Sequence, residues 1–155
     1  MSSSLDDLKK LRELTGAGVL DCRKTLDRFG GDYKLALAEL KKKGLEVAEK
    51  KKDRVTKQGI IEAYSHNKGK IVAVVEVLCE TDFVARNEDF KHFAHELALQ
   101  ISAMNPQSVG ELMGQPYIRD PKLTIDQLHK SLVAKIRENI QIGRIARYEL
   151  GEGKL

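Results

Sequence analysis

The apolar stretch at residues 71–78 constrains the fold of this chain more than any other feature. Its sequence, Ile-Val-Ala-Val-Val-Glu-Val-Leu, is rich in β-branched side chains, which favour extended strands. An Asn-Lys-Gly turn signal occupies residues 67–69, and Ile60, Ile61 and Tyr64 precede that turn. The pattern predicts a β-hairpin whose second strand is largely buried.

The best helix signal in the chain follows the hairpin. Asn87 is a residue type that caps helices, and Glu88 and Asp89 stand where acids complement the helix dipole. Apolar side chains then recur with helical spacing at Phe90, Phe93, Ala94, Leu97, Ala98 and Ile101. We expect a long amphipathic helix here.

The C-terminal part predicts one further helix and one further strand. Residues 105–121 show no clear period, but Thr124 and Gln127 form a capping box before a helix that ends at about Arg137. Alternating apolar positions between Ile140 and Leu150 then indicate a strand that joins the hairpin. The predicted fold class is α+β, with a small three-stranded antiparallel sheet packed against helices at residues 58–155.

The N-terminal part predicts three short helices. Ser4 can cap a helix with leucines at 5, 8, 11 and 14, and a second helix covers residues 19–29. Asp32 can cap a third helix, which we expect to end at Gly44. Residues 1–45 therefore predict a three-helix domain, and the lysine-rich residues 46–57 a basic linker or short helix before the second domain.

Composition excludes several classes of protein. The 155 residues are 41% hydrophobic and 32% charged, and no apolar run approaches the roughly 20 residues that cross a bilayer. The start of the chain lacks the pattern of a signal peptide, so we expect a cytoplasmic protein without membrane contact. Cys22 and Cys79 are too few for a disulfide framework or a zinc site and are expected to be reduced thiols.

The connection between the predicted buried strand and the long helix is the most unusual segment. It carries Phe83 and Val84 beside Asp82, although such connections favour small or polar residues. In one interpretation, Phe83 folds back onto the helix and Asp82 is a turn residue. In the other, Phe83 is an aromatic anchor that enters a pocket of a partner, with an acid beside it.

Three segments resemble one known family. The segment Thr-Asp-Phe-Val-Ala-Arg-Asn at residues 81–87 resembles the signature loop of the elongation factor Ts family. Residues 11–22, Leu-Arg-Glu-Leu-Thr-Gly-Ala-Gly-Val-Leu-Asp-Cys, resemble its N-terminal motif, and residues 148–153 resemble its C-terminal strand. The three matches occur in the family's order and span nearly the whole chain.

The resemblance implies a guanine-nucleotide exchange factor that acts on elongation factor Tu during translation elongation. Residues 1–45 would form a ubiquitin-associated-like domain that docks on the nucleotide-binding domain of the GTPase, and residues 58–155 a core domain of the dimerisation type. The signature loop would enter the GTPase near its magnesium and phosphate site and promote GDP release, through Thr81, Asp82, Phe83 and Val84. The N-terminal docking surface would comprise Arg12, Thr15, Gly16, Val19 and Leu20.

The same resemblance implies that the chain is not an enzyme, needs no cofactor and binds no nucleic acid directly. Its partner would be GDP-bound or nucleotide-free elongation factor Tu. Members of the family usually carry more sequence between the long helix and a Gly-Gln-Pro segment, which here is residues 114–116 and nearly adjoins Pro106. A chain shortened in this way leaves open a homodimer that completes the interface.

Three other interpretations follow from the residues alone. The lysines between Lys41 and Lys57 would suit a basic RNA- or ribosome-binding accessory protein, although Glu46, Glu49 and Asp53 interrupt them. A thiol enzyme would use Cys79 with His66 or His95 as base. A metal site would use His92 and His95 together with Cys79 or Asp82. For these cysteines and histidines, buried or surface structural roles are the simpler interpretation, so we predict no catalytic residue and no metal site.

Overall fold

The Val-rich stretch at residues 71–78 forms the central strand of a three-stranded sheet in the computed structural model, which describes residues 4–153. The strands are β1 (Gln58–His66), β2 (Ile71–Cys79) and β5 (Gln141–Glu149), in the order β1-β2-β5. Both pairs are antiparallel, with Tyr64 opposite Ala73 and Val74 opposite Ala146. The predicted α+β class, the hairpin and the joining third strand are confirmed.

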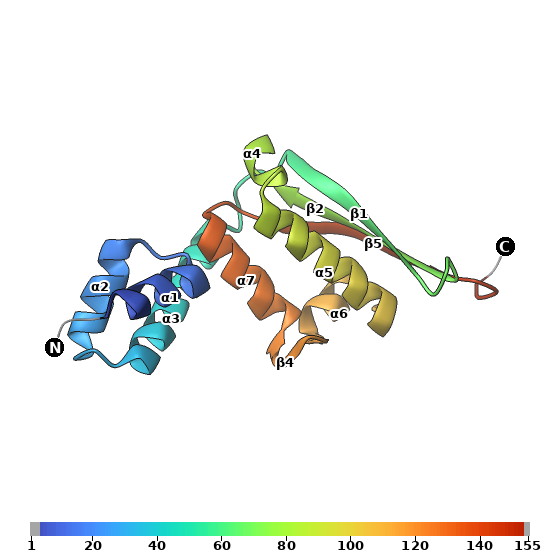
Figure 1. The fold of residues 1–155 in the computed structure, drawn as a ribbon. Coiled ribbons are helices and arrows are strands. Elements are labelled where there is room, and N and C mark those ends of the chain that lie inside the picture. The colour runs from blue at the N-terminus through green and yellow to red at the C-terminus, as the bar shows by residue number, and fades with distance from the viewer. Residues whose placement is uncertain (1–3, 154–155) are drawn as a thin grey trace. The chain divides into compact units, whose positions relative to one another are not determined.

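Helix α5 (Glu88–Met104) covers one face of this sheet, as Figure 1 shows. The buried side chains of β2 are those at alternate positions, Ala73, Val75, Val77 and Cys79. Phe90, Leu97 and Ile101 of α5 are fully buried as well. The side chain of Asn87 accepts hydrogen bonds from the backbone N–H groups of Asp89 (2.9 Å) and Phe90 (3.2 Å), which confirms the predicted cap.

Residues 105–124, which show no sequence period, contain three short elements. They are α6 (Val109–Gly114), β3 (Pro116–Tyr117) and β4 (Asp120–Thr124), and β3 pairs with β4 in a separate two-stranded sheet. The side chain of Gln100 in α5 positions β3, because its amide donates to the carbonyl of Pro116 (3.0 Å) and accepts from the N–H of Ile118 (3.0 Å). Because β3 is positioned by hydrogen bonds from α5 and not by neighbouring residues, no local sequence pattern predicts it.

The chain divides into two compact units. The N-terminal unit runs to Asp53 and also takes in Lys130–Glu138, whereas the core unit comprises Arg54–His129 and the residues from Asn139 onward. Helix α7 (Ile125–Ile136) thus contributes residues to both. Its predicted capping box is confirmed, since Thr124 Oγ1 accepts from the Gln127 N–H (3.2 Å) and Gln127 Oε1 from the Thr124 N–H (3.0 Å).

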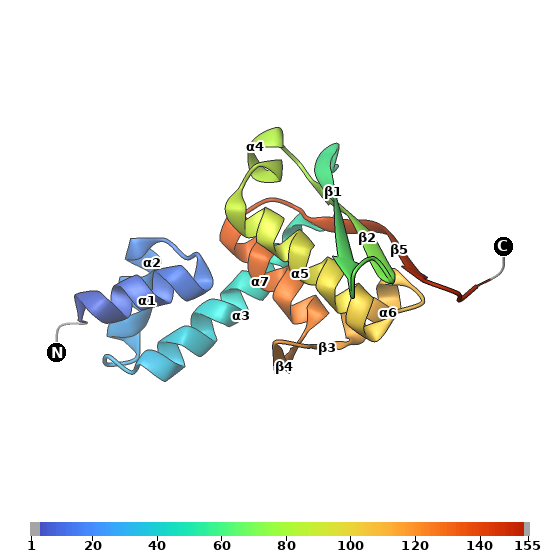
Figure 2. The same cartoon turned by 45° about the vertical axis from the view of Figure 1, so that its right-hand side comes forward.

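The N-terminal unit contains the three predicted helices, α1 (Leu5–Thr15), α2 (Val19–Arg28) and α3 (Tyr33–Lys51), drawn in Figure 2. Ser4 and Asp32 cap α1 and α3, each accepting a backbone N–H bond of 3.0 Å. The small core consists of Leu11, Cys22, Leu26, Ala36 and Leu40.

The predicted end of the third helix at Gly44 is wrong, because α3 continues through it to Lys51. A glycine inside a helix costs only about 1 kcal/mol relative to alanine, and the lysines, glutamates and alanine that follow are good helix formers. Tertiary packing explains the glycine: a Cβ at residue 44 would lie 2.9 Å from Cβ of Ala134. Gly44 thus permits close approach of another segment of the same unit.

Within residues 4–153, none of the helices is both long and apolar enough to cross a membrane.

Candidate functional site

The connection between β2 and α5, which the sequence analysis described as a loop, contains a single helical turn, α4 (Asp82–Ala85). Thr81 caps this turn, because its hydroxyl accepts the N–H of Val84 (3.3 Å). The backbone N–H of Ala85 then bonds to the carbonyl of Thr81 (3.2 Å). Asn87 caps the next helix immediately afterwards, so two successive caps determine the path of the segment.

Phe83 lies on the outside of α4. Its side chain is 79% exposed, so it does not fold back onto the following helix, and that interpretation is wrong. Ala85 is the buried residue of the turn, whereas Thr81, Asp82 and Val84 are half-buried. The Asp82 carboxylate accepts a hydrogen bond of 2.5 Å from the guanidinium of Arg86.

The base of α4 is held by buried and hydrogen-bonded residues of the core unit. Cys79 is fully buried, and its thiol donates to the carbonyl of Thr81 (3.2 Å). The Glu80 carboxylate accepts the backbone N–H of Asn139 (2.8 Å), whose side-chain amide donates to the carbonyl of Arg54 (2.6 Å). The sequence analysis missed Asn139 and Arg54, because their contribution depends on segments far apart in the chain.

The predicted N-terminal docking residues separate into two groups. Thr15 and Gly16 shape the turn between α1 and α2: the Thr15 hydroxyl donates to the carbonyl of Leu11 (2.6 Å), and Gly16 adopts a left-handed φ of 66°. A Cβ at Gly16 would also collide with the backbone of Lys135, so glycine is required there for packing. Arg12 is exposed, as are Val19 (47%) and Leu20 (69%).

Leu14, which is 58% exposed, adds to the apolar surface of the N-terminal unit and was not among the predicted docking residues. The spacing of the leucines could have predicted that Leu14 is exposed. An α-helix turns once in 3.6 residues, so leucines at every third position drift around it and do not share one face. Of these leucines, Leu11 is fully buried, whereas Leu5 (84%) and Leu14 at the two ends of the series are exposed.

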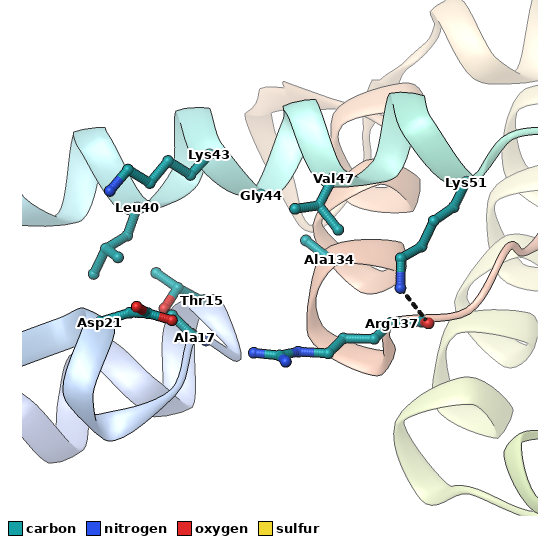
Figure 3. A pocket seen from close by; sticks show the side chains of 10 residues that line it. All are labelled: Thr15, Ala17, Asp21, Leu40, Lys43, Gly44, Val47, Lys51, Ala134 and Arg137. Atoms are coloured by element: carbon teal, nitrogen blue, oxygen red, sulfur yellow. Dashed lines mark hydrogen bonds between the residues drawn. The ribbon is translucent and has the colours of Figure 1, made fainter.

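A groove of about 370 Å³ lies beside this turn, within the N-terminal unit (Figure 3). Its walls combine apolar side chains such as Leu40 and Val47 with the charged residues Asp21, Lys43 and Arg137. The ammonium of Lys51 donates to the carbonyl of Arg137 (2.6 Å) at one end of the groove. This mixture of apolar and charged walls suits a protein segment better than a small apolar ligand.

The lysine-rich segment has charge partners of its own. Lys52 donates to Glu49, and this hydrogen bond raises the pKa of the lysine. Lys51 in turn donates to the carbonyl of Arg137, so these two lysines of the segment are hydrogen-bonded to acceptors of the same chain.

The residues considered for chemistry have structural partners. Cys22 and Cys79 are both free and buried, and burial raises the pKa of the Cys22 thiol, which is opposite to the change that activates a nucleophile. The His95 ring lies 3.3 Å from a carboxylate oxygen of Glu62, and the His92 ring 4.0 Å from one of Glu96. Residues 4–153 contain no group of three or more His, Cys, Asp or Glu side chains able to hold a metal.

The structure favours a protein-binding factor, because exposed apolar side chains lie on ordered helical turns in both units. A family model described as Elongation factor TS matches residues 80–155. Elongation factor Ts of Thermotoga petrophila is 40% identical over 196 aligned positions, which cover 99% of this chain and 98% of the relative. Elongation factor Ts of Nitratidesulfovibrio vulgaris is 38% identical, with 97% of this chain and 98% of the relative covered. The chain belongs to the elongation factor Ts family of translation elongation factors.

The alignment with the Thermotoga petrophila relative also shows a difference in length. Its 196 positions exceed the 155 residues of this chain, although it covers 99% of them, so the alignment opens gaps in this chain. The chain is therefore shorter than this relative, and the difference lies within the aligned region.

Proposed function

We propose that this chain is a guanine-nucleotide exchange factor for elongation factor Tu, and that the α4 turn is the element that promotes release of GDP. The exposure of Phe83 carries the proposal. A phenylalanine that is 79% exposed on a capped turn has the geometry of an anchor awaiting a pocket. Its neighbour Asp82 supplies an acid where the partner holds magnesium.

The energetics are adequate without covalent chemistry. A factor and a nucleotide that bind the same GTPase weaken each other by one shared coupling free energy. A thousandfold faster release of GDP requires about 4 kcal/mol. Burial of one phenylalanine contributes roughly 2–3 kcal/mol, and disturbance of the magnesium ligands by Asp82 would provide the rest.

The N-terminal unit supplies affinity in this proposal. Arg12, Val19 and Leu20 are exposed and would contact the nucleotide-binding domain of the GTPase. Thr15 and Gly16 would act indirectly, by shaping the turn that presents them. The two surfaces then have separable effects: one sets how tightly the factor binds, the other how fast GDP leaves.

The decisive experiment is dissociation of fluorescent GDP from elongation factor Tu with increasing concentrations of the chain. We expect acceleration that saturates, and its loss in Phe83→Ala. Leu150→Ala is the matched control, because Leu150 is 76% exposed in the same unit but lies outside α4. If the unsubstituted chain, folded, leaves the release rate unchanged, the proposed function is wrong.

We further propose that the face of the sheet opposite α5 pairs with a second copy of this chain. Ile61 and Tyr148 are 65% and 71% exposed there, and Val74 is half-buried between the strands that carry them. The Arg144 guanidinium donates to Glu76 (3.0 Å) on the same face, so the surface carries both charge signs side by side. A two-fold arrangement can therefore place opposite charges together across an apolar interface.

Sedimentation velocity tests whether the chain forms this dimer in solution. We expect a dimer that Ile61→Glu converts to a monomer, whereas Met104→Glu, an exposed position on the helix that covers the other face of the sheet, leaves it intact. A monomer at every concentration of the unsubstituted chain would rule out the pairing.

A further inference from the structure

We infer that Arg86 is a positioning residue for exchange, acting through Asp82 to hold the α4 turn in its active form. The inference rests on the proposed function. It begins with one contact, the 2.5 Å hydrogen bond between the Arg86 guanidinium and the Asp82 carboxylate. These residues stand at the two ends of α4, so the contact spans the segment that carries Phe83.

The turn needs such a contact because it is so short. A helix of four residues has few internal hydrogen bonds, and the first turn of any helix is unfavourable to form alone. Near its end α4 is closed by backbone bonds of 3.2 Å from the Arg86 N–H to the carbonyl of Asp82 and 2.9 Å from the Asn87 N–H to that of Val84. The side-chain contact between Asp82 and Arg86 closes the same turn a second time.

Phe83 depends on the turn for its direction. With 79% of its side chain exposed, it receives little support from neighbouring side chains, so the backbone of α4 determines where it points. Loss of the contact at Arg86 would let the turn open. Phe83 would then sample several directions and lose preorganisation for its pocket.

Charge gives Arg86 a second reason to pair with Asp82. An acid that approaches a nucleotide meets the negative phosphate groups, and a guanidinium bound to that acid offsets the repulsion. In the free chain the pair is solvated, since 73% of the Arg86 side chain and 49% of the Asp82 side chain are exposed. A partner that covers the pair removes this water and strengthens the interaction.

The test is saturation kinetics of fluorescent GDP release with Arg86→Gln, Arg86→Lys, Asp82→Asn and the double variant Asp82→Asn/Arg86→Gln. We expect Arg86→Gln to lower the saturating release rate about tenfold, with an unchanged half-saturating concentration and an unchanged Tm. Arg86→Lys, which keeps the charge, should recover part of the rate. The double variant should be no slower than Asp82→Asn alone, since Arg86 acts through that carboxylate.

Lys91→Gln is the matched control, because it removes an exposed cation from a solvated pair with Glu88 at the start of α5, in the same unit. It should leave the saturating rate unchanged. An Arg86→Gln variant as fast as the unsubstituted chain overturns the inference, and so do additive losses in the double variant, which would mean that Arg86 contacts the partner directly. Either result leaves the exchange function standing, whereas absence of acceleration by the unsubstituted chain removes both.

Discussion

The α4 turn and the neighbouring face of α5 each present a phenylalanine, and the two phenylalanines have opposite environments. Phe83 on α4 is 79% exposed, whereas Phe90 on α5 is completely buried against the sheet. Both segments begin with a side-chain cap, from Thr81 and Asn87. The difference lies in the surroundings: α5 is covered by the strands, and α4 has only Ala85 buried.

The same two regions each contain a carboxylate paired with an arginine. The Asp82–Arg86 pair is solvated, but the side chain of Glu96 is only 3% exposed and accepts hydrogen bonds from Arg119 and from the Tyr117 hydroxyl (2.6 Å). Burial alone would raise the pKa of the Glu96 carboxyl. The hydrogen bonds from Arg119 and Tyr117 together lower it by more than burial raises it, so the pKa of Glu96 lies below its ordinary value. The same kind of ion pair therefore stabilises the fold where it is buried, at Glu96, and remains accessible to a binding partner where it is solvated, at Asp82.

Exchanging each phenylalanine for alanine should separate the two regions most clearly. Phe90→Ala should reduce the free energy of unfolding by about 3–5 kcal/mol, because it leaves a cavity in the core. Phe83→Ala should change it by less than about 0.5 kcal/mol, since an exposed side chain contributes little to folding. Urea unfolding of both variants measures the contrast, and a large loss of stability in Phe83→Ala would show that α4 is part of the core.

Replacing the carboxylates of Glu96 and Asp82 should also reduce stability unequally, with the larger loss on α5, but the difference should be smaller than for the two phenylalanines. Glu96→Ala should cost about 2 kcal/mol of stability, because the buried Tyr117 hydroxyl loses its acceptor. Asp82→Ala should cost less than about 1 kcal/mol, as is usual for a solvated ion pair. The same urea titrations test this, and equal losses would contradict the assignment of Glu96 to the fold and Asp82 to the partner.

Alkaline pH should weaken the buried network on α5. Burial, together with the hydrogen bond to Glu96, raises the pKa of Tyr117 from 10.0 to about 12. The unfolded chain loses this proton first, so the stabilisation is complete below pH 10 and disappears as the pH rises through about 12. Stability measured across this range should fall less steeply in Tyr117→Phe; identical profiles would mean that the hydroxyl does not couple to folding.

On α2 in the N-terminal unit, an exposed and a buried leucine allow the same comparison, and here we expect the smallest effect on exchange. Leu20→Ala removes a side chain that is 69% exposed and should raise the half-saturating concentration for exchange about threefold to tenfold, without loss of stability. Leu26→Ala empties a fully buried position on the same helix and should instead lower Tm. The reverse pattern would exclude the exposed face of α2 from the docking surface.

Several parts of the fold could be predicted from the sequence because their signals are local. The caps at Ser4, Asp32 and Asn87 lie within three residues of the N–H groups that they satisfy. The β-branched run of β2 and the period of α5 likewise describe their own surroundings. For this reason the first two N-terminal helices, the start of the third, the hairpin and the long helix were predicted close to their observed bounds.

The candidate site was predictable only in part. Sequence motifs selected residues 81–84 and the turn near Gly16, but the roles within each set depend on packing. Thr81 caps the turn, Phe83 is exposed, and Gly16 is required by the approach of Lys135. The assignment of these residues to partner contacts stays a prediction that the exchange kinetics test.

By itself, the sequence determined the types of most elements and the family, because hydrophobic period, caps and motifs are properties of short segments. The tertiary structure alone decided that α3 passes through Gly44, that Gln100 positions β3, and that Asn139 connects Arg54 to the base of α4. It also decided which phenylalanine is buried. The physical reason is that burial and long-range hydrogen bonds depend on segments that meet only after the chain has folded.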